Sequence, residues 1–333
     1  MTSIDLRTHY LGLTLNSPII VGACPMTLQC EQVRQFAISG AGAVVLPSLF
    51  EEQVVAAFAR RGDRLDPIEE ATALGDEDTL NDDYNGGLDN YIWTVRQLKN
   101  TVGIPVIASL NGTTTGHWLD IGRELQDAGA DALEITAECW ELRPEQTADE
   151  TERQMLNMIS ELKTRVTIPI AVKISPFHSN LQNLCWQLYR HGAAGVVCFG
   201  SEPVWNVAID QVTNSLHWPL TSPSSIHQTI AGCIRAANNA PPISLAACGG
   251  VSTTEDVIRC MLAGANGVMM TSEIYRNGPD AIAHVVEGLT SFINRNTFGS
   301  LEELAAGRPK PELGRSSWLH SATWSDRDYQ MVR

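Results

Sequence analysis

Positive charge and long apolar runs are scarce in this sequence. Lys and Arg together number 23 against 38 Asp and Glu, so the formal net charge of the 333 residues is −15. That charge repels nucleic-acid phosphates and anionic lipids, and we find no local basic patch that would offset the repulsion. No stretch reaches the length of a membrane helix, and the N-terminus lacks the apolar core of a signal peptide. We therefore expect no nucleic-acid partner, no membrane partner and no secretion.

Recognisable metal and disulfide patterns are missing as well. The eight cysteines form no CxxC pair, and several lie in apolar runs, where Cys acts as a small hydrophobe. The eight histidines form no HxH or HExxH pattern, and the acidic run 78–83 lacks the glycine and glutamate spacing of an EF-hand. For His117 and His178 we favour solvated or capping roles. The sequence thus predicts no metal site and indicates a reducing cytoplasm as the location.

What the sequence does contain is a regular alternation of two kinds of strand entrance. One kind begins at a proline, which lacks a backbone donor and suits the first residue of a strand. The other begins at a Gly-Ala pair, whose glycine suits the end of the preceding helix. Such alternation predicts an α/β fold, a (β/α)₈ TIM barrel, because odd and even strands fill its interior in alternating layers. The entrances lie at 17–20, 42–45, 104–107, 129–132, 168–171, 192–195, 241–244 and 264–267.

Segments with helical spacing or a capping residue separate these strands. We expect one barrel domain over 1–295 and an irregular C-terminal tail over 296–333. A stretch at 48–90, after the second strand, is far longer than an ordinary connection and is acidic, so we expect a long excursion over the barrel mouth. The expected helices lie at 30–40, 90–100, 116–128, 148–165, 178–191, 224–238, 253–263 and 279–293.

The strongest chemical signal lies after the last two strands. Gly249 and Gly250 follow the seventh strand, and Thr271 and Ser272 follow the eighth, where many barrels bind phosphate. Glycines let the backbone approach an anion, and the helix that starts near Ser252 adds its positive dipole end. The alternative is that the two glycines merely turn the chain.

Motifs along the chain resemble the FMN-dependent dihydroorotate dehydrogenase family, and most closely its divergent dihydroorotate dehydrogenase-like branch, over roughly residues 3–295. The motifs that carry the resemblance are YLGL and NSP at 10–18, VVLPSLFEEQ at 44–53, ASLNG at 108–112, AVKISPF at 171–177, CGGV at 248–251, and TS through GP at 271–279.

The resemblance implies that FMN binds at residues that follow the strands. For Lys173 the chemistry of the residue agrees, since a lysine within an apolar strand could place positive charge beside the flavin edge where negative charge develops. The alternative is an ion pair with Glu134, and the two roles can coexist. The implied cofactor residues are Ala23, Ser48, Asn111, Lys173, Ser222, Gly249, Gly250, Thr271 and Ser272.

The implied substrate side departs from the family. Cys139 keeps the position of the family's catalytic base, whereas Thr136 and Glu141 replace its asparagines and Pro47 replaces its lysine. The acids beside Cys139 disfavour a thiolate, so we expect a raised thiol pKa unless a cation approaches. The alternative is a packed cysteine without a catalytic role.

The sequence is therefore interpreted as a flavin-dependent oxidoreductase with a small-molecule substrate. By resemblance it would convert dihydroorotate to orotate in pyrimidine biosynthesis, with Cys139 and Lys173 as catalytic residues. Cys139 would take the C5 proton, flavin N5 would take the C6 hydride, and a soluble acceptor would reoxidise the cofactor. We expect a homo-oligomer, with a dimer preferred. One alternative is a flavin-free barrel enzyme that binds a phosphorylated metabolite and could use Lys173 as a Schiff-base amine. The other is a non-catalytic barrel that binds a partner.

Overall fold

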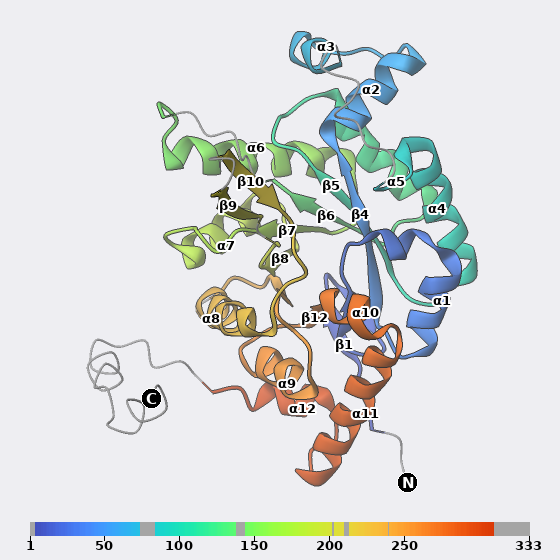
Figure 1. Ribbon diagram of the computed structural model, residues 1–333, viewed down its shortest axis with the longest axis vertical. Coiled ribbons are helices and arrows are strands. Elements are labelled where there is room, and N and C mark those ends of the chain that lie inside the picture. Colours follow the sequence, from blue (N-terminus) through green and yellow to red (C-terminus); the bar gives the residue numbers. More distant parts are fainter. Residues whose placement is uncertain are drawn as a thin grey trace.

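A closed barrel of parallel strands forms the centre of the molecule (Figure 1). The computed structural model describes residues 4–73, 84–137, 144–201, 203–209, 213–238 and 240–309. Each expected entrance leads into one barrel strand, so the predicted (β/α)₈ barrel is confirmed. In order around the barrel the strands are β11 (Ser244–Cys248), β12 (Gly267–Met270), β3 (Ile19–Val21), β4 (Ala43–Phe50), β5 (Val106–Asn111), β6 (Ala132–Thr136), β7 (Ile170–Ile174) and β8 (Gly195–Cys198).

Helices surround the barrel at the positions that the sequence predicted. All but the last lie between consecutive barrel strands of the chain, and each buries an apolar face against the barrel. These helices are α1 (Cys30–Ile38), α4 (Gly87–Thr101), α5 (Ile121–Ala128), α6 (Ala148–Arg165), α7 (Leu181–Arg190), α8 (Ile226–Ala237), α9 (Thr254–Leu262) and α11 (Asp280–Arg295). None of the described helices is both long and apolar enough to span a bilayer.

A short N-terminal hairpin closes the bottom of the barrel. Its strands β1 (Thr8–Tyr10) and β2 (Leu13–Leu15) are joined by Leu11 and Gly12, whose φ angles of 55° and 76° fit a two-residue turn of the type favoured in hairpins. The Leu11 amide donates to the Ser244 hydroxyl at the start of β11 (3.0 Å). Tyr10 and Leu11 are buried with the side chains of the barrel interior. The opposite, C-terminal end of the strands is therefore left for a site.

The long excursion after β4 folds partly as helices. It begins with α2 (Glu51–Arg61) and α3 (Pro67–Ala73), which extend beyond the barrel at the end of β4 (Figure 1). Short 3₁₀ turns also connect elements: η1 (Pro25–Leu28), η3 (His117–Asp120) and η4 (Pro223–Ser225).

Two parts of the chain differ from the expectation. An antiparallel ribbon of β9 (Val204–Ala208) and β10 (Thr213–His217) follows β8 and was not predicted. The segment from residue 296, expected to be irregular, contains α12 (Leu301–Ala306), because two leucines spaced three apart give it a face that is buried on the barrel. Residues 310–333 of that segment lie outside the described residues. After β12 a further short helix, α10 (Ser272–Asn277), precedes α11.

Candidate active site

A cavity of about 1360 Å³ opens at the C-terminal ends of the strands. This is the end of a (β/α)₈ barrel at which active sites are built. Every residue that the resemblance implied for FMN lines this cavity, although those residues come from the ends of several strands and, for Ser222, from the segment before η4. The lining residues among them are Ala23, Ser48, Asn111, Lys173, Ser222, Gly249, Gly250, Thr271 and Ser272. Their common location is a finding, whereas the role of each stays a prediction.

Strand β4 brings Ser48 to the cavity through an irregularity. Its pairing with β5 shifts register between Val45 and Ser48, and Pro47, which cannot donate a ladder hydrogen bond, lies within the shift. The Ser48 hydroxyl is 2.7 Å from that of Ser109 on β5, so the two share a hydrogen bond. Asn111, the last residue of β5, also lines the cavity.

Lys173 on β7 lines the cavity and pairs with Glu134 on β6. The exposed fraction of the lysine side chain is 12% and that of the glutamate is 1%. Burial by itself lowers the pKa of Lys173. The Glu134 carboxylate and other nearby groups raise the pKa by more than burial lowers it, so it lies above the usual value. Lys173 is therefore a cation at neutral pH. The structure shows the ion pair and the cavity-facing position together.

The backbone of the loop after β11 approaches the start of α8 closely. Gly249 and Gly250 have φ angles of 110° and 74°, in the region that favours glycine. A Cβ atom on Gly250 would lie 2.3 Å from the backbone nitrogen of Ile226, the first residue of α8. The Thr229 hydroxyl, one turn further along α8, lies 2.9 Å from the carbonyl oxygens of both Cys248 and Gly249. This loop and the N-terminus of α8 thus form one cradle.

A second contact ties that cradle to the end of β12. The Thr221 amide donates to the Ser272 hydroxyl (2.9 Å), so the segment before η4 lies against the start of α10. Arg276, one turn further along α10, donates to the Thr221 carbonyl (2.8 Å) and also lines the cavity. Amides at a helix N-terminus, hydroxyl groups and a guanidinium are the donors that bind a phosphate monoester. The sequence did not predict Arg276, whose only signal is its spacing four residues after Ser272.

Known proteins resemble this chain over most of its length. The model of the family described as dihydroorotate dehydrogenase matches residues 5–293. The chain belongs to the dihydroorotate dehydrogenase family. The catalytic subunit of dihydroorotate dehydrogenase B (NAD(+)) from Thermoplasma acidophilum is 22% identical over 308 residues, which cover 90% of this chain and 97% of that protein. Dihydroorotate dehydrogenase A (fumarate) from Limosilactobacillus reuteri is 25% identical over 314 residues, covering 90% and 96%.

The predicted base lies in the segment after β6, between two described segments of the chain. Cys139 and Glu141 lie outside the described residues, which resume at residue 144 after Ala137. Cys24 and Cys248 do line the cavity, but burial raises the pKa of each thiol to about 11. These two cavity thiols are therefore protonated at neutral pH and poorly suited to act as bases.

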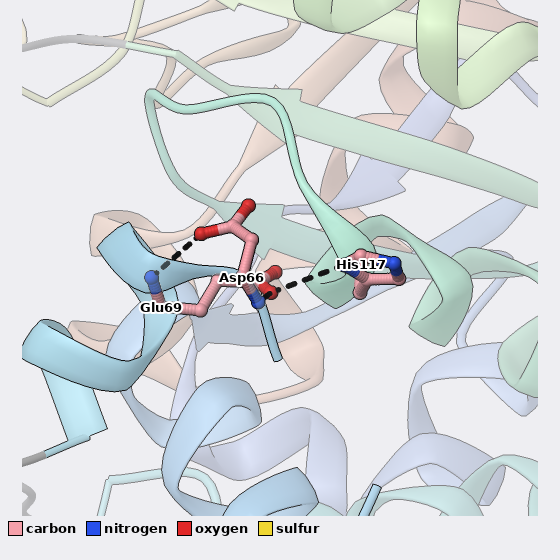
Figure 2. Close-up of side chains that lie close together, drawn as sticks. All are labelled: Asp66, Glu69 and His117. Atoms are coloured by element: carbon pink, nitrogen blue, oxygen red, sulfur yellow. Dashed lines mark hydrogen bonds and ion pairs between the residues drawn. The ribbon is translucent and has the colours of Figure 1, made fainter. Parts of the chain in front are cut away.

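A polar cluster connects the excursion after β4 to η3 (Figure 2). Ligand atoms of Asp66, Glu69 and His117 lie within 4.8 Å of one another, so the described residues do contain one candidate cation site, which the sequence did not predict. Backbone amides already occupy its carboxylates. Asp66 accepts from Ile68 and Glu69 at 2.8 and 2.9 Å, while Glu69 accepts from Asp66 and Trp118 at 2.8 Å each. The cluster therefore fits a capping role better than metal binding.

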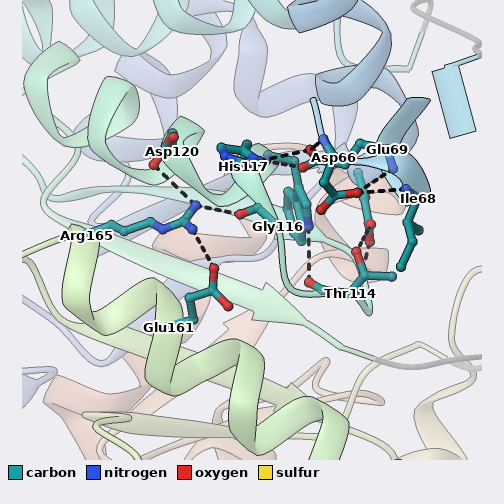
Figure 3. Close-up of polar contacts among 11 residues, drawn as sticks. Asp66, Ile68, Glu69, Thr114, Gly116, His117, Asp120, Glu161 and Arg165 are labelled. Atoms are coloured by element: carbon teal, nitrogen blue, oxygen red, sulfur yellow. Dashed lines mark hydrogen bonds and ion pairs between the residues drawn. The ribbon is translucent and has the colours of Figure 1, made fainter. Parts of the chain in front are cut away.

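Arg165 of α6 contacts η3 and the residue before it (Figure 3). Its guanidinium donates to the Gly116 carbonyl (2.6 Å) and lies 3.2 Å from the Asp120 carboxylate. Residues of α3, η3 and α6 are thereby joined, which makes this network structural support for the wall of the barrel beneath the excursion.

Proposed function

We propose that the protein is an FMN-dependent oxidoreductase of the dihydroorotate dehydrogenase type. The observation that carries the proposal is that one cavity contains both the glycine cradle, with its amide and hydroxyl donors, and a buried, cationic Lys173. When bound, FMN supplies the two-electron acceptor of the reaction. Gly249, Gly250 and Ser272 would bind its phosphate, with Arg276 neutralising the charge at that end.

The residues of the chain have separate tasks in this proposal. Lys173, held by Glu134, would orient the flavin ring and would place positive charge where negative charge develops on reduction. Cys139 stays the predicted base that removes a proton from the carbon next to the one that loses hydride. The substrate is a small molecule with a CH–CH bond, for which dihydroorotate, named for the relatives, is the reference compound.

One experiment tests the cofactor and the chemistry in sequence. The purified protein is incubated with excess FMN, desalted, and examined by absorbance; we expect bound flavin in a ratio near one per chain. Anaerobic mixing with candidate reductants, dihydroorotate included, then measures flavin reduction. A protein that never retains flavin contradicts the proposal as a whole. Retained flavin that no compound with a CH–CH bond reduces contradicts only the dehydrogenase chemistry.

We propose further that the protein works as a homodimer in a reducing cytoplasm. All seven described cysteines are free thiols, which is consistent with the reducing cytoplasm.

The ribbon of β9 and β10 supports the homodimer. It pairs Trp205 with Leu216 on one face, and these residues are 65% and 48% exposed. A two-stranded ribbon is marginally stable alone, so an apolar face on it favours a covering partner. Relatives named as catalytic subunits would suggest a different subunit instead. Sedimentation of wild type and of Trp205→Ser tests the homodimer. We expect wild type to sediment as a dimer and the variant to sediment as a monomer.

A further inference from the structure

The N-terminal hairpin is inserted into the bottom of the barrel. The Tyr10 side chain is fully buried and packs with the side chains of the barrel interior. Leu11 beside it lies so close to β8 that a Cβ atom on Gly195 would be 2.3 Å from the Leu11 Cδ2 atom. A (β/α)₈ barrel usually fills its interior with Val, Ile and Leu, so small residues there leave space for the tyrosine ring. The small interior residues are Ala43, Ala132, Ala171 and Ala246.

Two charged residues lie in the next layer of the interior, toward the cavity. Every second side chain of a barrel strand points inward. Glu134 on β6 therefore points inward two residues after Ala132, and Lys173 on β7 does so two residues after Ala171. Lys173 lines the cavity, whereas Tyr10 is not among the described residues that line it. Tyr10 thus lies beneath the ion pair, on the side away from the cavity.

Tyr10 and Glu134 each bury a polar group that lacks a hydrogen bond. Within the described part of the chain, neither the Tyr10 hydroxyl nor the Glu134 carboxylate has a hydrogen-bond partner, apart from the contact of the carboxylate with Lys173. Buried polar groups are nearly always hydrogen-bonded, because an unsatisfied one destabilises the fold. Burial, and after it the charge of Glu134, raises the pKa of Tyr10 well above its usual value. The hydroxyl therefore keeps its proton and can donate it.

We propose that Tyr10 is a positioning residue for Lys173: its hydroxyl supplies the Glu134 carboxylate with a hydrogen bond, relayed by one buried water. A buried water commonly connects two to four polar groups that otherwise lack partners. The hydrogen bond stabilises the charge of the carboxylate. Glu134 then draws less strongly on the ammonium group of Lys173, and more of that positive charge acts on the flavin. The inference rests on the proposed function and deepens it with a residue outside the cavity.

A double-mutant cycle tests the link between Tyr10 and the ion pair without flavin. Tyr10→Phe removes the hydroxyl and keeps the ring, so the variant should fold. In the full-length protein without added FMN, we expect this substitution to raise the unfolding equilibrium constant by about tenfold. In the double variant Lys173→Met with Glu134→Leu, the hydroxyl has no carboxylate to serve, and the same substitution should change the constant by less than about threefold. Equal effects in the two backgrounds overturn the inference.

Tyr91→Phe is the matched control for the loss of a buried hydroxyl. Tyr91 on α4 is also fully buried, but it packs outside the barrel with the surrounding helices. Its hydroxyl accepts the Ser109 amide (2.9 Å) and donates to the Ser109 carbonyl (3.4 Å). Tyr91→Phe should therefore raise the unfolding equilibrium constant to the same extent in both backgrounds. Coupling to the ion pair as large as that of Tyr10 would mean that the cycle reports the loss of any buried hydroxyl, which also overturns the inference.

The midpoint potential of bound FMN tests the positioning role. Without the hydroxyl, Glu134 draws Lys173 away from the flavin edge, so the negative charge of reduced flavin is less stabilised. We expect Tyr10→Phe to retain FMN and to shift the reduction equilibrium by about three- to tenfold toward oxidised flavin, tenfold being about 30 mV for a two-electron couple. Tyr91→Phe should keep the wild-type potential. An unchanged potential in Tyr10→Phe overturns the positioning role. A wild type that retains no flavin defeats the proposed function instead, and the cycle still decides whether Tyr10 supports the pair.

Discussion

The ammonium group of Lys173 lies against the carboxylate of Glu134 on the neighbouring strand, and both side chains are almost fully buried. A buried pair of this kind is costly to break, because the partner that remains is an unpaired charge out of water. Lys173 also lines the cavity, so the pair connects the stability of the barrel with the site. Removing one partner or both therefore separates the structural role from the cofactor role.

We expect Glu134→Gln to lower the free energy of unfolding by about 3–5 kcal/mol, because Lys173 then stays buried without its counter-charge. The double variant Lys173→Met with Glu134→Leu should recover most of this loss, since neither charge remains. It should still bind FMN poorly. Urea unfolding and flavin content per chain measure the two effects. A Glu134→Gln protein as stable as wild type would show that the pair contributes little.

The pH dependence of this pair follows from the raised pKa of Lys173. The stabilisation is fully present below the unfolded pKa of about 10.4 and is lost as the pH rises through the higher folded value. The difference in unfolding free energy between wild type and the double variant Lys173→Met with Glu134→Leu should therefore stay constant between about pH 6 and pH 9 and decrease only in stronger alkali. Unfolding titrations at several pH values measure this difference. A steady change within that neutral range would mean that another group governs the pair.

Much of the fold could be predicted because its signals are local. Prolines and Gly-Ala pairs mark the strand entrances, and the expected helix at 148–165 coincides with α6 (Ala148–Arg165). The register shift in β4 and the ribbon of β9 and β10 carry no such signal. Strand Val204–Ala208 is short and exposed and pairs with no barrel strand, so its pairing depends on tertiary context.

The residues of the site also fall into those that local signals predict and those that depend on tertiary contacts. Residues at or directly after strand ends, such as Asn111 and Gly249, could be predicted because every strand of the barrel ends on the same side. Arg276 and Glu51 could not, since each acts through partners far away in sequence. Arg276 bonds Thr221 and Glu51 bonds Thr113, contacts that depend on how loops pack. The pairing of Lys173 with Glu134 was open as an alternative, and the adjacent strands β6 and β7 make both roles compatible.

Cys139→Ala tests the predicted base. If the thiol removes the substrate proton, the variant should retain FMN while flavin reduction by the preferred reductant slows by about 10²–10⁴-fold. The acids Glu138 and Glu141 beside it in sequence predict a raised thiol pKa, so the wild-type rate should increase toward alkaline pH and the variant's rate should not. Anaerobic stopped-flow absorbance across pH provides both measurements. Equal rates for the two proteins would remove the thiol from the mechanism.

Glu69→Gln tests whether the cluster at η3 is a cap or a metal site. The carboxylate of Glu69 is buried and accepts amides from two segments, so we expect a loss of about 1–3 kcal/mol in unfolding free energy. Glu70→Gln is the control, since Glu70 is the exposed next residue of the same helix. Zinc or a chelator should leave the melting temperature of wild type unchanged. A rise with zinc that Glu69→Gln abolishes would instead establish a metal site.

Two glycines with nearly equal backbone angles isolate the phosphate cradle. Gly250 and Gly62 have φ angles of 74° and 79°, so alanine at either position should cost about 1–2 kcal/mol of backbone strain. Only at Gly250 would the added Cβ meet backbone, at 2.3 Å from the Ile226 nitrogen, whereas no atom lies within 4 Å at Gly62. We expect Gly250→Ala to displace the α8 N-terminus and to lose FMN, while Gly62→Ala is destabilised but keeps it. The measurement is the flavin content of the two variants, compared at equal folded fraction. Full flavin retention by Gly250→Ala would place the phosphate elsewhere in the cavity.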